Sequence, residues 1–99
     1  KAVRLAVENN ANTIVLVHSG SGIDMSAWAD KCAALLYAWY PGQNGMLAIR
    51  DILIGKVNPS GKLPVTFYKN VEQLPDFEDY KMAGRTYRYF KEIEKDSLI

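Results

Sequence analysis

The chain has 99 residues, 48% of them hydrophobic, which is enough for one small domain with its own core. The formal net charge is +1 and the charges are mixed along the chain, so we expect no nucleic-acid partner and no anionic-membrane anchor. With one cysteine, Cys32, and one histidine, His18, the sequence excludes an internal disulfide and lacks the ligands of a typical metal site.

The sequence shows no targeting or membrane segment. No apolar stretch reaches the roughly 18 residues that span a bilayer. The opening stretch KAVRLAVENN has charge at both ends and no hydrophobic region of a signal peptide. We expect no membrane partner, and localisation stays open, because a longer protein containing this chain is compatible with the periplasm or with secretion.

The first elements alternate between helix and strand. Residues 1–9 place apolar side chains at helical spacing and predict a short amphipathic helix, which the turn formers NNAN end. Residues 13–18, TIVLVH, form a β-branched apolar run, which is typical of a strand buried on both faces of a parallel sheet. The loop SGSG, residues 19–22, follows directly.

The middle of the chain repeats this pattern. Residues 24–32 are ambiguous and fit one or two helical turns. Residues 33–39, AALLYAW, are apolar throughout, and their length and the Pro-Gly that follows favour a strand over a buried helix. Residues 44–55 predict a helix with Gly55 at its C-terminal cap. The expected apolar face of this helix consists of Met46, Ile49, Leu53 and Ile54.

The last third contains one more expected strand and a tail. Residues 58–64, NPSGKLP, form a loop, and residues 65–68, VTFY, predict a third strand with Pro64 tolerated at its start. Residues 69–99 are mostly irregular and rich in tyrosine and phenylalanine. The order strand, loop, helix, strand predicts an α/β fold with a mostly parallel, doubly wound sheet.

Ligands of such sheets bind outside the carboxyl ends of the strands. Two loops leave the predicted strands there, and we expect both to open on the same edge of the sheet. The substrate-side or domain-seam candidates on these loops are His18, Ser19, Ser21, Trp39, Tyr40 and Gln43. Strand alternation predicts opposite faces for the two aromatic residues, and both core and site-wall roles stay open for them.

Several catalytic motifs are incomplete in this sequence. HSGSG is not a nucleophile elbow, because Ser19 stands where G-x-S-x-G requires glycine. A dinucleotide fingerprint fails because Met25 stands where its third glycine belongs. Paired carboxylates would indicate glycosidic chemistry, but most of the 11 acidic residues lie on expected polar helix faces or in the tail, where solvation accounts for them.

Five stretches taken together resemble one family. They are TIVLVHSGSGIDMSAW, ALLYAWYPGQNG, ILIGKVNPSGKLPVTF, LPDFEDY and GRTYRYF, and they run in this order from about residue 10 to Phe90. They resemble the second domain of glycoside hydrolase family 3, which contains β-glucosidases and β-xylosidases. The resemblance implies a partial three-layer α/β/α sandwich with an irregular C-terminal tail, so that residues 1–99 are a single partial domain with 69–99 as the tail.

The resemblance also implies a function for a longer parent protein. The family hydrolyses terminal non-reducing β-D-glucosyl or β-D-xylosyl residues with retention, and needs no cofactor. Its aspartate nucleophile lies in a barrel domain and its glutamate acid/base lies upstream of the matched stretch, so no catalytic residue is expected in this chain. The expected partners are a carbohydrate substrate and the barrel domain of the same parent.

Two departures from the family pattern stand out. Where the family has P-G-Q-E-G-G, this chain has Asn44 for the acid and Met46 for the last glycine. After GRTYRYF the family continues with P-F-G-x-G-L-S-Y, whereas residues 91–99 read KEIEKDSLI, which suggests a truncated or frameshifted end. The alternative hypothesis is a stand-alone, non-catalytic α/β module that binds a partner or small ligand. As an isolated chain it is a possible homo-oligomer.

Overall fold

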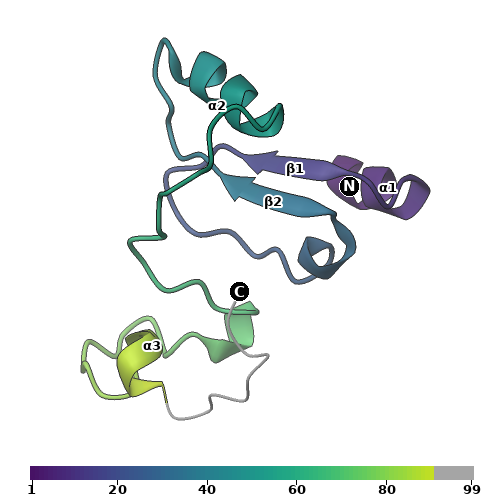
Figure 1. The fold of residues 1–99 in the computed structure, drawn as a ribbon. Helices are drawn as coiled ribbons and strands as arrows, with labels where there is room; N and C mark the ends of the chain where they lie inside the picture. The colour runs from purple at the N-terminus through teal and green to yellow at the C-terminus, as the bar shows by residue number, and fades with distance from the viewer. Residues whose placement is uncertain (91–99) are drawn as a thin grey trace. The chain divides into compact units, whose positions relative to one another are not determined.

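The computed structural model describes residues 1–90, which form two compact units (Figure 1). The first unit comprises residues 1–23 and 27–62. The second unit comprises residues 24–26 together with the described residues from Leu63 onward. The KEIEKDSLI departure lies outside the described residues.

The first unit opens with helix α1, Ala2–Asn9, as the apolar spacing predicted. Val7 is the buried side chain of this helix. Arg4 and Glu8, one turn apart, form an exposed ion pair with 2.9 Å between Nε and Oε1. The helix ends in the predicted turn, where the Thr13 hydroxyl donates to the Asn10 carbonyl at 2.6 Å.

Two parallel strands follow, which confirms the main strand prediction. Strand β1, Ile14–Val17, and strand β2, Ala34–Tyr37, lie side by side with Val15 opposite Leu35 (Figure 1). The short 3₁₀ helix η1, Ala29–Lys31, precedes β2 in the ambiguous region. Val15 and Val17 are buried, whereas Leu16 is half-buried and Ile14 is exposed, so within the described structure one face of β1 is covered more completely than the other.

Strand β2 is shorter than predicted and is correspondingly less buried. The run of residues 33–39 does not continue as a strand beyond Tyr37, because Trp39 has a φ of 51°. That positive φ lies in the left-handed region and cannot extend a strand. Ala38, the residue after β2, still donates its N–H to the Val17 carbonyl at 2.9 Å.

Helix α2, Gly45–Leu53, ends as the sequence predicted. Gly55 has a φ of 73°, its N–H donates to the Ile52 carbonyl at 3.0 Å, and the N–H of Lys56 donates to the Asp51 carbonyl at 2.8 Å. This pair of bonds is a Schellman motif, in which the glycine supplies the left-handed residue.

The predicted apolar face of α2 is only partly correct. Ile49 is buried, but Met46, Leu53 and Ile54 are exposed within the described structure. Ile49 is thus the buried side chain of α2 within the described structure.

The second unit lacks the third strand expected at residues 65–68. Only Tyr68 forms an isolated bridge, and the described sheet contains β1 and β2 alone. Pro64 has no N–H that could donate to a neighbouring strand. The Thr66 hydroxyl accepts a hydrogen bond from the N–H of Tyr87 in the segment that forms α3. Phe67 and Met25 are the buried apolar side chains of this unit.

Two short helices order part of the tail. The 3₁₀ helix η2, Val71–Gln73, is capped by Asn70, whose Oδ1 accepts from the N–H of Gln73 at 3.2 Å. Helix α3, Thr86–Tyr89, is a single turn.

A parallel strand pair with flanking helices is an α/β arrangement, as predicted. Among residues 1–90, no helix combines the length and apolar character needed to cross a bilayer.

Candidate functional site

The loops at the carboxyl ends of β1 and β2 come together, as the parallel topology requires. In the first loop, the Ser19 hydroxyl donates to the Ser21 carbonyl at 3.0 Å. The Tyr37 hydroxyl, from the last residue of β2, donates to the same carbonyl. Ser19 and Tyr37 therefore fix the loop after β1 from both sides. Tyr37 was missed as a site residue because its position inside an apolar run indicated core.

The aromatic residues after β2 have different environments. Trp39 is half-buried and packs edge-on against Tyr37, with ring centroids 4.8 Å apart and an interplanar angle of 61°. Tyr40 is 79% exposed. The alternation expected of a strand does not apply to them, because the strand ends at Tyr37.

Tyr40 lies against the glycine loop after β1. A Cβ built on Gly20 would lie 2.7 Å from Tyr40 Cε2 and 2.8 Å from its hydroxyl oxygen. Real Cβ atoms essentially never approach other atoms so closely. The absence of a side chain at Gly20 is therefore what allows the Tyr40 ring to occupy its place.

The turn after Tyr40 is also built on missing side chains. Gly42 has a φ of 69°, and a Cβ on Gly45 would lie 2.1 Å from Pro41 Cβ. The backbone at the first residue of α2 therefore has no room for a side chain, and the positive φ in the turn favours glycine. Gln43 and His18, the remaining candidates on this edge, are exposed.

Several of the described carboxylates are engaged in local structure. Asp51 accepts from Arg50 Nη2 at 2.7 Å and lies 3.3 Å from Lys56 Nζ. Asp24 Oδ1 accepts from the Ser26 hydroxyl at 2.6 Å and from its N–H at 2.9 Å, and these bonds lower the pKa of Asp24 below its ordinary 3.8. Glu92, Glu94 and Asp96 lie outside the described residues.

Other carboxylates close turns. Asp76 Oδ1 accepts from the Glu78 N–H at 3.2 Å, and Asp79 Oδ1 accepts from the Lys81 N–H at 2.9 Å. Within residues 1–90 there is no cluster of three or more histidine, cysteine or acidic side chains that could bind a metal ion.

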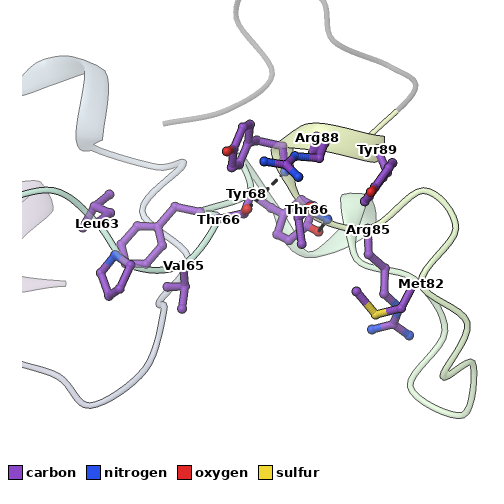
Figure 2. Close-up of a pocket in the computed structure, with 12 residues that line it drawn as sticks. Leu63, Val65, Thr66, Tyr68, Met82, Arg85, Thr86, Arg88 and Tyr89 are labelled. Atoms are coloured by element: carbon purple, nitrogen blue, oxygen red, sulfur yellow. Dashed lines mark hydrogen bonds between the residues drawn. The ribbon is translucent and has the colours of Figure 1, made fainter.

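A groove of about 790 Å³ lies within the second unit (Figure 2). The N–H of Thr86 donates to the Tyr68 hydroxyl and the N–H of Tyr87 donates to the Thr66 hydroxyl, both at 3.2 Å. These bonds hold α3 beside the segment that precedes η2. The groove is lined by Leu63, Pro64, Val65, Thr66, Phe67, Tyr68, Met82, Arg85, Thr86, Tyr87, Arg88 and Tyr89.

Sequence reasoning did not predict this groove. Its walls come from LPVTFY and from RTYRY, two segments about twenty residues apart whose pairing depends on side-chain hydroxyl groups. The available signal was the density of tyrosine and arginine in RTYRY, which is unusual for a solvated tail.

Comparison with known proteins decides the family. The family model described as "Glycosyl hydrolase family 3 C-terminal domain" matches residues 1–96. The chain belongs to this family. The glycosyl hydrolase family 3 match spans both units, from α1 past the α3 segment.

Curated relatives agree with the family 3 assignment. A xylan 1,4-beta-xylosidase from Xylanibacter ruminicola is 60% identical over 72 residues, which cover 73% of this chain and 8% of that protein. A probable beta-glucosidase J from Emericella nidulans is 37% identical over 107 aligned residues, which cover 98% of this chain and 12% of that protein. The chain thus spans about a tenth of the length of these relatives. No solved structure matches it.

Proposed function

We propose that this chain is part of a retaining β-glycosidase that hydrolyses terminal, non-reducing β-D-glucosyl or β-D-xylosyl residues. The observation that carries the proposal is the family 3 match over residues 1–96. The relatives support the substrate class, since they are named a xylan 1,4-beta-xylosidase and probable beta-glucosidases.

The proposed chemistry needs two carboxyl groups about 5–5.5 Å apart, one a nucleophile and the other an acid/base. We place both outside this chain. This is supported by the engagement of Asp24, Asp51, Asp76 and Asp79 in caps, turns and ion pairs, which leaves them in stable local roles. The chain's own contribution is the β1–β2 edge, whose loops face the substrate or the barrel domain of the same protein.

The polar and aromatic groups of that edge suit a carbohydrate environment. Ser19 and Ser21 supply hydrogen-bonding atoms, and Tyr40 supplies an exposed aromatic ring. Pyranose rings combine hydroxyl groups with apolar C–H faces, so they can use both kinds of group. No cofactor enters the proposed double displacement.

The test is hydrolysis by the full-length protein that carries this chain. We expect release of nitrophenol from p-nitrophenyl β-D-glucoside or β-D-xyloside, and ¹H NMR should show the β-anomer of the sugar as the first product. Absence of hydrolysis would overturn the glycosidase proposal, and the α-anomer as first product would overturn the retaining mechanism. Sequencing the flanking DNA separates this proposal from a stand-alone module, because only the glycosidase needs a barrel domain upstream.

A further inference from the structure

We propose that Tyr40 forms the platform on which a pyranose ring of the substrate stacks, and that the absence of a side chain at Gly20 leaves the space in which this ring lies. The inference rests on the proposed function and adds to it a named binding residue and the part of the sugar that this residue contacts. It begins from the position of Tyr40 at the carboxyl edge of the β1–β2 pair, where ligands of parallel sheets bind.

The ring is positioned before any ligand arrives. Gly20 leaves space that a methyl group would fill, with Tyr40 Cε2 and the hydroxyl oxygen only 2.7 and 2.8 Å from the Cβ position. Beyond the carboxyl end of the neighbouring strand β2, Trp39 at φ 51° sets the direction in which the chain enters residue 40. A non-glycine residue in this region is strained by roughly 1–3 kcal/mol, and such strain gathers at functional sites. The edge-on contact with Tyr37 supports Trp39 there.

The surroundings of Tyr40 favour a sugar over an apolar partner surface. A surface that packs against another domain normally presents a contiguous apolar patch. Here the exposed residues that follow Tyr40 and the half-buried Pro41 are Gly42, Gln43 and Asn44, and those of the facing loop are His18, Gly20, Ser21 and Gly22. Exposed apolar side chains return only farther along each segment, at Ile23 and Met46. One exposed aromatic ring flanked by amide, hydroxyl and imidazole groups matches a pyranose, which needs an apolar face and several hydrogen bonds.

The experiment measures steady-state kinetics of the full-length protein on p-nitrophenyl β-D-xyloside and β-D-glucoside. Tyr40→Ala should raise KM about three- to tenfold, in line with the strength of aromatic contacts. Because stacking holds the sugar in both ground and transition states, kcat should stay nearly unchanged. Tyr40→Phe, which keeps the ring, should keep most of the affinity. Tyr80→Ala removes an equally exposed tyrosine from the second unit and is the matched control.

Gly20→Ala gives an independent test through the ring's position. Its Cβ would displace the end of an exposed ring, so we expect a raised KM in a folded protein. In the double variant Gly20→Ala with Tyr40→Ala, the glycine substitution should add nothing, because the ring it displaces is gone. Gly61→Ala, where the new Cβ meets nothing within 4 Å, is the control.

The possible outcomes distinguish the role of Tyr40, the role of Gly20 and the proposed function from one another. An active wild type whose KM is unchanged by Tyr40→Ala would overturn this inference and leave the proposed function standing. Additive effects of the two substitutions would overturn the positioning role of Gly20. A lowered melting temperature with normal KM would assign Tyr40 to domain packing instead. A wild-type protein without glycosidase activity would overturn the proposed function and, with it, the substrate assigned to Tyr40.

Discussion

Replacing Gly55 by alanine tests how helix α2 ends. Gly55 has a φ of 73°, and its N–H and that of Lys56 close the Schellman motif. A Cβ at this position would meet nothing within 4 Å, so the substitution introduces no clash and changes the backbone energy alone. An L-residue in the left-handed region costs about 1–2 kcal/mol. Alanine also restricts the unfolded chain, which offsets about 0.4–1 kcal/mol of that loss.

The net expectation for Gly55→Ala is a loss of about 1 kcal/mol in the free energy of unfolding. For a domain of 60–100 residues, this lowers the melting temperature by about 4–8 °C. The assay is urea and thermal unfolding of the chain followed by circular dichroism. Gly55→Asn should lose less, because asparagine enters the left-handed region more readily.

Gly61 is the matched control for this substitution. It has equally open surroundings but no positive φ, so Gly61→Ala should be neutral or stabilising by about 0.4–1 kcal/mol. Equal changes in the free energy of unfolding for Gly55→Ala and Gly61→Ala would contradict this prediction, because they would show that the positive φ of Gly55 has no effect on stability.

Three further predictions concern packing, pH and association. Ile49→Ala should lower the free energy of unfolding by about 2–5 kcal/mol because Ile49 is buried. Ile54→Ala, at a 67% exposed position, should change it by no more than about 0.5 kcal/mol when both variants are unfolded with urea. Hydrogen bonds from the Ser26 hydroxyl and N–H lower the pKa of Asp24 below its ordinary 3.8. These bonds therefore stabilise the folded chain above pH 3.8, and this stabilisation is lost as the pH falls through the pKa of Asp24 in the folded state. Ser26→Ala should raise the Asp24 pKa in an NMR titration, and an unchanged pKa would contradict this cause. The isolated chain should self-associate through its open strand edges and exposed apolar side chains, so sedimentation as a well-folded monomer at tens of micromolar would contradict that expectation.

The sequence was most informative where local chemistry and long-range packing agree. The β-branched run before His18 predicted β1, and its pairing with β2 followed from the helix–strand alternation. Gly55 was recognisable as a helix cap because a glycine after an apolar periodic stretch has few other roles. In each case the signal lies within a few neighbouring residues.

Sequence reasoning failed where side chains decided the backbone. The strand stops at Tyr37 because Trp39 has a positive φ, which no propensity predicts for tryptophan. In place of the expected strand at residues 65–68, the hydroxyls of Tyr68 and Thr66 accept hydrogen bonds from the N–H groups of Thr86 and Tyr87 in α3. Such pairings between distant segments leave no periodic pattern in the sequence.

The candidate site, too, could be predicted from the sequence only in part. The convergence of the two loops was predictable from parallel topology, and the structure places Tyr40 against Gly20 as that topology allows. The contribution of Tyr37 was not predictable, because its ring lies in an apolar run while its hydroxyl reaches the carbonyl of Ser21 in the facing loop. Half-buried Tyr37 therefore belongs to strand β2 and also anchors the facing loop.

We propose above that this chain is a non-catalytic part of a family 3 glycosidase whose catalytic carboxyl groups lie outside it. The most direct measurement is the activity of a chimera in which this chain replaces the matching segment of the Xylanibacter ruminicola xylan 1,4-beta-xylosidase, which is 60% identical over 72 residues. We expect a folded chimera that releases nitrophenol from p-nitrophenyl β-D-xyloside with a kcat within about tenfold of the unmodified enzyme, while the isolated chain releases none. A folded chimera without activity, or turnover by the isolated chain that is lost when one of its own acidic residues is replaced, would contradict the claim.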